Sequence, residues 1–107
     1  MTSVAFPIDG DNLDSIVVAH FGRAKNFLIY DTEGDEYEIY ENPEAAGEET
    51  LPPNFLHEKG TGAVGCFGLG HRAVELFEKL NIDVYKAVSG TVRENLEAFK
   101  EGELPRF

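Results

Sequence analysis

Residues 19–24 hold side chains that can bind a metal or an anion. His20 supplies an imidazole and Arg23 a guanidinium, with Phe21 and Gly22 between them. Imidazole is a ligand for iron and copper, and a guanidinium donates hydrogen bonds to anions. The glycine allows the backbone to turn sharply at this point. We therefore expect a ligand-binding loop here, with a purely structural turn as the alternative.

Residues 65–72 hold a second candidate set, in the order Gly-Cys-Phe-Gly-Leu-Gly-His-Arg. Cys66 offers a thiolate and His71 a second imidazole. Gly68 and Gly70 lie just before an expected helix, whose first N–H groups have no partner inside the helix and suit an anion. The alternatives are an inert core position for Cys66 and a solvent-exposed one for His71.

The two segments are expected to lie at the same edge of a sheet. The glycine-rich turn directly follows residues 63–67, an apolar run that is typical of a buried strand. Residues 19–24 follow the first expected strand, residues 4–8. In open α/β sheets, ligands bind outside the carboxyl ends of the parallel strands. This rule predicts that both segments contribute to one site.

Other chemistries fit the sequence less well. The glycines of the turn are spaced G-x-x-G-x-G, which is not the dinucleotide-binding fingerprint, and no phosphate-binding Lys-Ser/Thr pair follows them. Cys66 could act as a nucleophile with His20 or His71 as its base, but its apolar surroundings favour a core position. Two-metal hydrolysis needs clustered carboxylates, and Asp9 and Asp31 do not form an obvious set.

The elements that position these segments alternate along the second half of the chain. Apolar runs and turn signals predict the order β-β-β-α-β-α-β-α. Alternating strands and helices predict a mostly parallel sheet, and a hairpin of the second and third strands adds an antiparallel one. The simplest solution is one domain, residues 1–107, with an α/β fold and a five-stranded mixed sheet. The expected strands are residues 4–8, 27–30, 37–40, 63–67 and 82–87, and the apolar helix faces are Leu51, Phe55 and Leu56, then Ala73, Val74, Phe77 and Leu80, then Val92, Leu96 and Phe99.

Three local signals predict where helices begin and end. Gly60 is expected to end the first helix and Gly102 the last, because glycine readily adopts the left-handed conformation found after helices. Thr91 and Glu94 have the spacing of a capping box, in which the two residues satisfy each other's free N–H groups at a helix start.

The charge of the chain limits its partners. The 107 residues include 20 acidic and 9 basic ones, for a net charge of −11. This excess disfavours nucleic acids and anionic membrane surfaces, both of which attract Lys and Arg. No apolar run approaches the ~20 residues that span a bilayer. A lone cysteine and the lack of a visible signal peptide predict a cytoplasmic protein.

Five segments of the chain form a collinear pattern. They are residues 5–9 (Ala-Phe-Pro-Ile-Asp), 19–24 (Ala-His-Phe-Gly-Arg-Ala), 41–43 (Glu-Asn-Pro), the glycine-rich turn and residues 89–92 (Ser-Gly-Thr-Val). This pattern resembles the dinitrogenase iron–molybdenum cofactor-binding family, whose small members include proteins of the NifX, NafY and NifB C-terminal type. The resemblance implies a three-layer α/β/α ribonuclease H-like fold with one antiparallel strand in its five-stranded sheet.

The resemblance also implies ligands. Its carriers use the His of the His-Phe-Gly element, here His20, and some have a Cys before the glycine-rich turn, here Cys66. The chain departs from several relatives at residues 44–49, where an acidic segment replaces a loop rich in His and Gly. That change adds negative charge near an anionic cluster, so Arg23, Lys25 and Arg72 would have to compensate.

The sequence thus predicts a non-catalytic carrier of a metal–sulfur cluster, either an iron–molybdenum cofactor or a related cluster of iron, molybdenum or copper. Cofactor biosynthesis, an unidentified donor or acceptor protein, and a monomer or weak homodimer are the accompanying expectations. The alternative is a metal-free regulatory or interaction module on the same fold. The expected metal ligands are His20 and Cys66, and the further cofactor-binding residues are Phe21, Gly22, Arg23, Gly68, Gly70 and His71.

Overall fold

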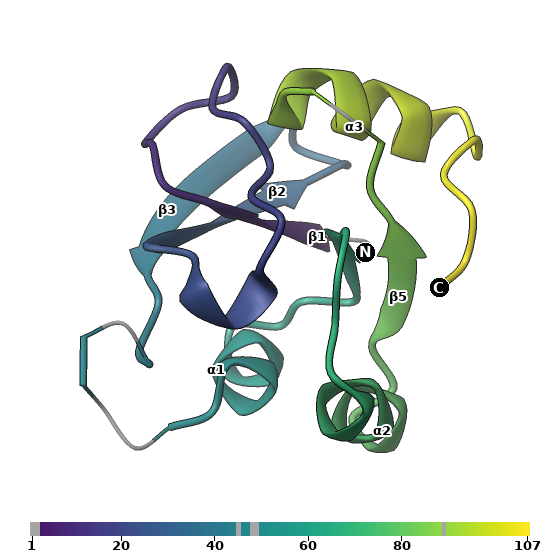
Figure 1. Ribbon diagram of the computed structural model, residues 1–107. Coiled ribbons are helices and arrows are strands. Elements are labelled where there is room, and N and C mark those ends of the chain that lie inside the picture. The colour runs from purple at the N-terminus through teal and green to yellow at the C-terminus, as the bar shows by residue number, and fades with distance from the viewer. Residues whose placement is uncertain (1–2, 45, 48–49, 89) are drawn as a thin grey trace.

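A five-stranded mixed sheet forms the centre of the protein, seen in a computed structural model that describes residues 3–44, 46–47, 50–88 and 90–107 (Figure 1). The strand order is β3-β2-β1-β4-β5. β2 runs antiparallel to both of its neighbours, while β4 is parallel to both β1 and β5. The predicted α/β fold with one antiparallel strand is therefore confirmed. The strands are β1 (Ser3–Ile8), β2 (Asn26–Asp31), β3 (Glu36–Glu41), β4 (Ala63–Cys66) and β5 (Asp83–Lys86).

Helices cover both faces of the sheet. α1 (Pro52–Glu58) and α2 (His71–Lys79) lie on one face and α3 (Val92–Lys100) on the other, which makes three layers (Figure 1). A short 3₁₀ helix, η1 (Phe21–Arg23), precedes β2. Apart from η1, the order of elements is the predicted one. No helix among the described residues is long and apolar enough to cross a membrane.

Each layer boundary has its own apolar core, and the central strand β1 contributes to both. Alternate side chains of a strand point to opposite faces. Ala5 therefore packs under α1 and α2, and Phe6 packs toward α3. At the neighbouring Gly65, a Cβ atom would lie 2.5 Å from the ring of Phe6, so this position in β4 has room only for glycine.

Helix boundaries follow the predicted signals with one exception. Gly60 and Gly102 have φ values of 78° and 73° and follow α1 and α3. The capping box of Thr91 and Glu94 is present at the start of α3. The predicted inward position of Leu51 is wrong, because α1 begins one residue later at two prolines and Leu51 is 52% exposed.

The two outer edges of the sheet differ. The backbone N–H of Lys86 in β5 donates to the carbonyl of Pro105 at 2.8 Å, and the N–H of Phe107 donates to the carbonyl of Val84 at 2.9 Å. The last residues thus run along β5 and cover its edge (Figure 1). β3 is the terminal strand on the other side. Its sequence, Glu-Tyr-Glu-Ile-Tyr-Glu, places a glutamate at alternate positions or at its end.

Candidate functional site

The loop after β1 carries His20 to the glycine-rich turn after β4, as predicted. His20 forms an isolated parallel bridge with Gly68. The carbonyl of His20 accepts a hydrogen bond from the N–H of Arg23 at 3.0 Å, which closes η1. Phe21 is buried, with its ring 5.0 Å from that of Phe27 and 5.6 Å from that of Phe77. The buried ring anchors a turn whose imidazole is exposed.

An open cleft of about 970 Å³ lies between η1, the start of α1 and one side of α2. Six of the eight predicted site residues line it: His20, Phe21, Gly22, Arg23, Gly68 and Gly70. The remaining lining residues are Glu44, Leu51, Pro52, Pro53, Leu69, Arg72, Ala73, Glu75, Leu76 and Lys79. The cleft therefore combines an apolar wall from two helices with charged side chains.

The cleft holds three cationic side chains, those of Arg23, Arg72 and Lys79. Arg93, Lys100 and Arg106 each form an ion pair, at 3.0 to 3.1 Å, on other parts of the surface. Across the described ranges, no such pair involves Arg23, Arg72 or Lys79, all of which line the cleft. Two carboxylates, Glu44 and Glu75, also line it. In a chain of net charge −11, this cleft therefore has more cationic than carboxylate side chains in its lining.

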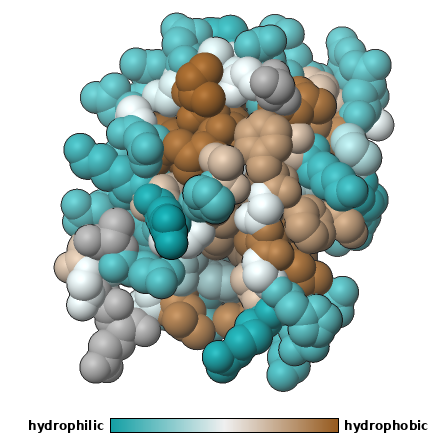
Figure 2. Space-filling view, in the orientation of Figure 1, coloured by the Kyte–Doolittle hydropathy of each residue, from teal (hydrophilic) through white to brown (hydrophobic). Residues whose placement is uncertain are grey.

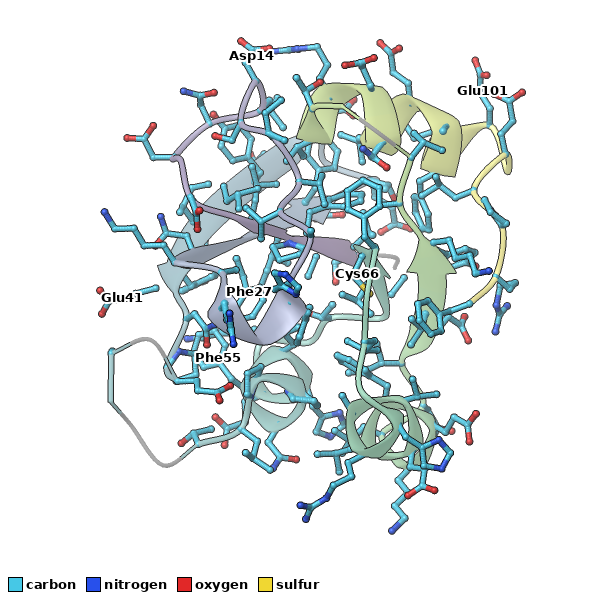
Figure 3. All side chains as sticks on the ribbon, in the orientation of Figure 1. Asp14, Phe27, Glu41, Phe55, Cys66 and Glu101 are labelled. Atoms are coloured by element: carbon cyan, nitrogen blue, oxygen red, sulfur yellow. The ribbon has the colours of Figure 1, made fainter. Side chains whose placement is uncertain are left out.

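Cys66 lies behind the cleft. Its side chain is 0% exposed and belongs to the core under α1 and α2. Figure 3 shows its sulfur in the interior, where β4 ends. Desolvation raises the pKa of the Cys66 thiol to about 12. At neutral pH this side chain is a protonated thiol, which is a poor metal ligand and a poor nucleophile.

His71 also lies outside the cleft lining. Its side chain is 87% exposed, and Nε2 is 3.0 Å from a carboxylate oxygen of Glu75 one helical turn later. Its backbone N–H is nevertheless placed to bind a ligand, because His71 is the first residue of α2. The hydrogen bonds of α2 begin with the N–H of Ala73, which donates to Gly70. The N–H groups of His71 and Arg72 precede that bond and are free to meet a ligand.

Sequence reasoning missed the contribution of Lys79 and of the start of α1 with the residue before it. Lys79 lies seven residues after Arg72 on α2, a spacing that places both on one side of a helix. That spacing was the available signal. The residues Leu51, Pro52 and Pro53 gave no signal, because only the packing of α1 beside η1 brings them to the cleft.

Comparison with known proteins identifies the family. The family described as dinitrogenase iron-molybdenum cofactor matches residues 2–102. The chain belongs to this family. The resemblance noted in the sequence is thereby confirmed, and family membership indicates a cofactor-binding or carrier type of protein rather than a known catalytic one.

Relatives with similar sequences and structures span nearly the whole chain. An uncharacterized protein of Methanocaldococcus jannaschii is 33% identical, with all of this chain and 92% of that protein aligned. A Thermotoga protein provisionally named NifB is 37% identical with a TM-score of 0.85, over 99% of this chain and 93% of its own. The apo form of the orange protein from Desulfovibrio gigas has a TM-score of 0.89 at 24% identity, over 100% and 93% of the two chains, and so shares the fold.

Proposed function

We propose that this protein is a carrier that holds an anionic metal–sulfur cluster in the cleft beside His20 and releases it unchanged. The observation that carries the proposal is the set of three cations in the cleft, Arg23, Arg72 and Lys79, none of which forms an ion pair with another described residue. Elsewhere in the described part of this acidic chain, Arg93, Lys100 and Arg106 are paired with carboxylates. Lys59 and Lys86 lie over the rings of Tyr40 and Phe107. Cationic side chains that line a cleft without internal partners attract an anion from solution.

Each part of the cleft has a role in holding such a cargo. Arg23 and Arg72 donate hydrogen bonds to its sulfides, and the free N–H groups at the start of α2 do the same. Phe21 and Leu69 give the cleft an apolar floor that limits water. The imidazole of His20 is a suitable ligand for iron or copper. With one such side chain, most metal positions keep sulfide from the cluster itself, which suits a protein that must release its cargo.

The role of Cys66 remains a prediction. Its full burial and raised pKa favour a cluster held without the thiolate, and its place in the core favours a structural role. Ligation by Cys66 would require the thiol to lose its proton and the wall of the cleft to open. The variant Cys66→Ala separates the two roles, because the protein would retain less metal only if Cys66 were a ligand.

Further features of the proposal extend the family assignment. The cluster contains iron, molybdenum or copper, its delivery belongs to cofactor biosynthesis, and an unidentified protein donates or accepts it. The protein is non-catalytic, cytoplasmic, and a monomer or weak homodimer. The strand order, with β2 opposed to its neighbours, and the three layers support a ribonuclease H-like fold.

A second candidate is a metal-free interaction module. Ile16, Phe67 and Val88 are exposed apolar side chains on segments near the carboxyl ends of the parallel strands. Apolar residues gather in the middle of the face seen in Figure 2, surrounded by hydrophilic ones. Such gatherings often mark contacts with other proteins. The two candidates differ in whether the protein retains metal.

The test is anaerobic reconstitution with iron, molybdate, copper and sulfide, followed by desalting, metal analysis and visible absorption. Four variants are compared with the wild type: His20→Ala, Cys66→Ala, Arg72→Gln and Lys86→Gln. Lys86 lies outside the cleft lining and is the matched control for the loss of one charge. We expect a stoichiometric chromophore in the wild type and in Lys86→Gln.

His20→Ala is expected to lose most of the metal, and Arg72→Gln to weaken retention about three- to tenfold, the effect of one nearby charge at partial exposure. Retention by Cys66→Ala would assign that residue to the core, and loss would make it a ligand. A folded wild type that retains no metal under any condition would refute the carrier and leave the interaction module.

A further inference from the structure

We propose that Asn42 is the positioning residue of the cleft, fixing the η1 turn in the shape that cargo binding requires. This inference rests on the proposed function. Asn42 directly follows β3, and its side chain is 0% exposed. It does not line the cleft, so it must act through its neighbours.

The carboxamide of Asn42 joins two parts of the cleft wall. Its Nδ2 donates to the carbonyl of Ala24 at 2.9 Å and to that of Gly22 at 3.5 Å. Its Oδ1 accepts a hydrogen bond from the N–H of Glu44 at 3.0 Å. The backbone N–H of Asn42 donates to the carbonyl of Lys25 at 2.9 Å, which ties β3 to the start of β2.

These bonds bear directly on the residues that meet the cargo. Gly22 lies between the buried Phe21 and the cationic Arg23, so a bond to its carbonyl holds the backbone that carries both side chains. Glu44 is the carboxylate that faces this turn, and a Cβ atom on Gly22 would lie 3.6 Å from its Oε2. One buried side chain thus holds the backbone beside a cation and at an anion of the cleft.

Asparagine meets a demand that similar residues do not. The site needs a donor for two carbonyls and an acceptor for one N–H, and a carboxamide supplies both. An aspartate at position 42 would place a carboxylate against the carbonyls without an N–H to offer them. An alanine would leave all three backbone groups without their partner, which is unfavourable for buried groups.

Asn95 provides a matched control in the same molecule. It is also 0% exposed, and its Nδ2 donates to the carbonyls of Val88 and Thr91, both at 2.9 Å. Its Oδ1 accepts from the N–H of Val88 at 2.7 Å. The chemistry is the same as that of Asn42, but neither Val88 nor Thr91 lines the cleft. A loss of stability alone would therefore be shared by variants at both positions.

The experiment compares Asn42→Asp, Asn42→Ala and Asn95→Asp, all checked for folding by circular dichroism. Hydrogen exchange of the cargo-free proteins is followed at the amides of Arg23 and Ala24, which donate to His20 and Phe21 within the turn. Retention of tetrathiomolybdate with copper, as a soluble metal–sulfide anion, is measured in parallel. Both Asn42 variants should exchange these two amides about tenfold faster than the wild type, and retain the probe at least about fivefold more weakly.

Asn95→Asp should leave both readouts at wild-type values while it lowers stability in urea unfolding, because the donor that it removes serves only the carbonyls of Val88 and Thr91. In Asn42→Asp, acidification should restore protection of the turn, because the protonated carboxyl regains one O–H donor. Recovery of protection in acid can be measured in Asn42→Asp, so the inference remains testable even if Asn42→Ala does not fold.

Two outcomes would overturn the inference. Unchanged exchange in the turn of the folded Asn42 variants would show that other contacts hold it. Faster exchange with unchanged probe retention would show that the hydrogen bonds of Asn42 do not affect cargo binding. Equal loss of retention in Asn95→Asp would show the same, and in both cases the proposed carrier function would stand. No retention by the wild type would instead remove the proposed function, and this result is distinct from either of the others.

Discussion

Cys66 illustrates how burial decides what a reactive side chain can do. A thiol after a strand and before a glycine-rich turn has the sequence pattern of a ligand, and the pattern places it next to the correct turn. It does not reveal that the side chain points into the core under α1 and α2. The same turn presents Gly68 and Gly70 to the cleft and hides the thiol.

The buried thiol should make stability fall at alkaline pH. The folded-state pKa is about 12, above the ordinary value of about 8.5, so above pH 8.5 the unfolded chain releases a proton that the folded protein keeps. The contribution of this thiol to the free energy of unfolding is fully present below pH 8.5 and is lost as the pH rises toward 12. Between pH 7.5 and 10, the wild type should lose up to about 2 kcal/mol more than Cys66→Ala in urea unfolding. Equal losses in the two proteins would contradict the burial.

Glu44 is expected to oppose the cargo. Its carboxylate lines the cleft together with Arg23, Arg72 and Lys79, so an anion that binds there must approach a like charge. Glu44→Gln should raise the affinity for tetrathiomolybdate about two- to threefold. Glu97→Gln, which removes a charge from α3 on the opposite side of the sheet, should leave it unchanged. An unchanged affinity in Glu44→Gln would mean that the anion binds away from this wall.

How much of the site the sequence could predict depends on the residue. The meeting of His20 and Gly68 follows from a general rule about strand ends, and it holds here. The hydrogen bonds from the side chain of Asn42 to Gly22 and Ala24 could not be predicted, because these partners lie on another element. An Asn-Pro pair in a sequence does not indicate which carbonyls the asparagine side chain will contact.

At the scale of elements, β4 depends on close contact with β1. The Cβ position of Gly65 is occupied by the ring of Phe6, which is fully buried. Gly65→Ala should therefore destabilise the protein by about 1–3 kcal/mol through overpacking, measured by urea unfolding. Gly62→Ala is the control, because its Cβ would meet only the Ser3 carbonyl at an ordinary 3.7 Å. That variant should be neutral or slightly more stable, and a similar loss in both would argue against the contact with Phe6.

The elements themselves were largely predictable, and the exceptions have local causes. The alternation of strands and helices gave the order, and Thr91 with Glu94 fixed the start of α3 through side chain bonds that depend only on spacing. The prediction that Leu51 faces inward came from helical spacing, which groups it with Phe55 and Leu56. Two prolines favour the first turn of a helix, so the helix begins after Leu51 and leaves it exposed beside the cleft.

At the scale of the whole molecule, the net charge of −11 and the cationic cleft should respond to salt in opposite ways. Salt screens the repulsion among the acidic residues and also screens the attraction between the cleft and an anion. Raising sodium chloride from 10 to 150 mM (about a fourfold shorter screening length) should raise the melting temperature and weaken tetrathiomolybdate binding. Lys86→Gln should keep the same salt dependence of binding as the wild type, whereas Arg72→Gln should flatten it. Binding that does not change with salt would indicate recognition through His20 and apolar contacts alone.

The unequal edges of the sheet bear on how this protein avoids aggregation. An uncovered strand edge offers backbone groups to which a strand from another chain can add. The C-terminal residues cover β5, so β3 is where such growth would begin. There Glu36, Glu38 and Glu41 place like charges that repel a second copy of the strand. Replacing all three with glutamine should remove that protection, and fibrillar assembly should then start from β3.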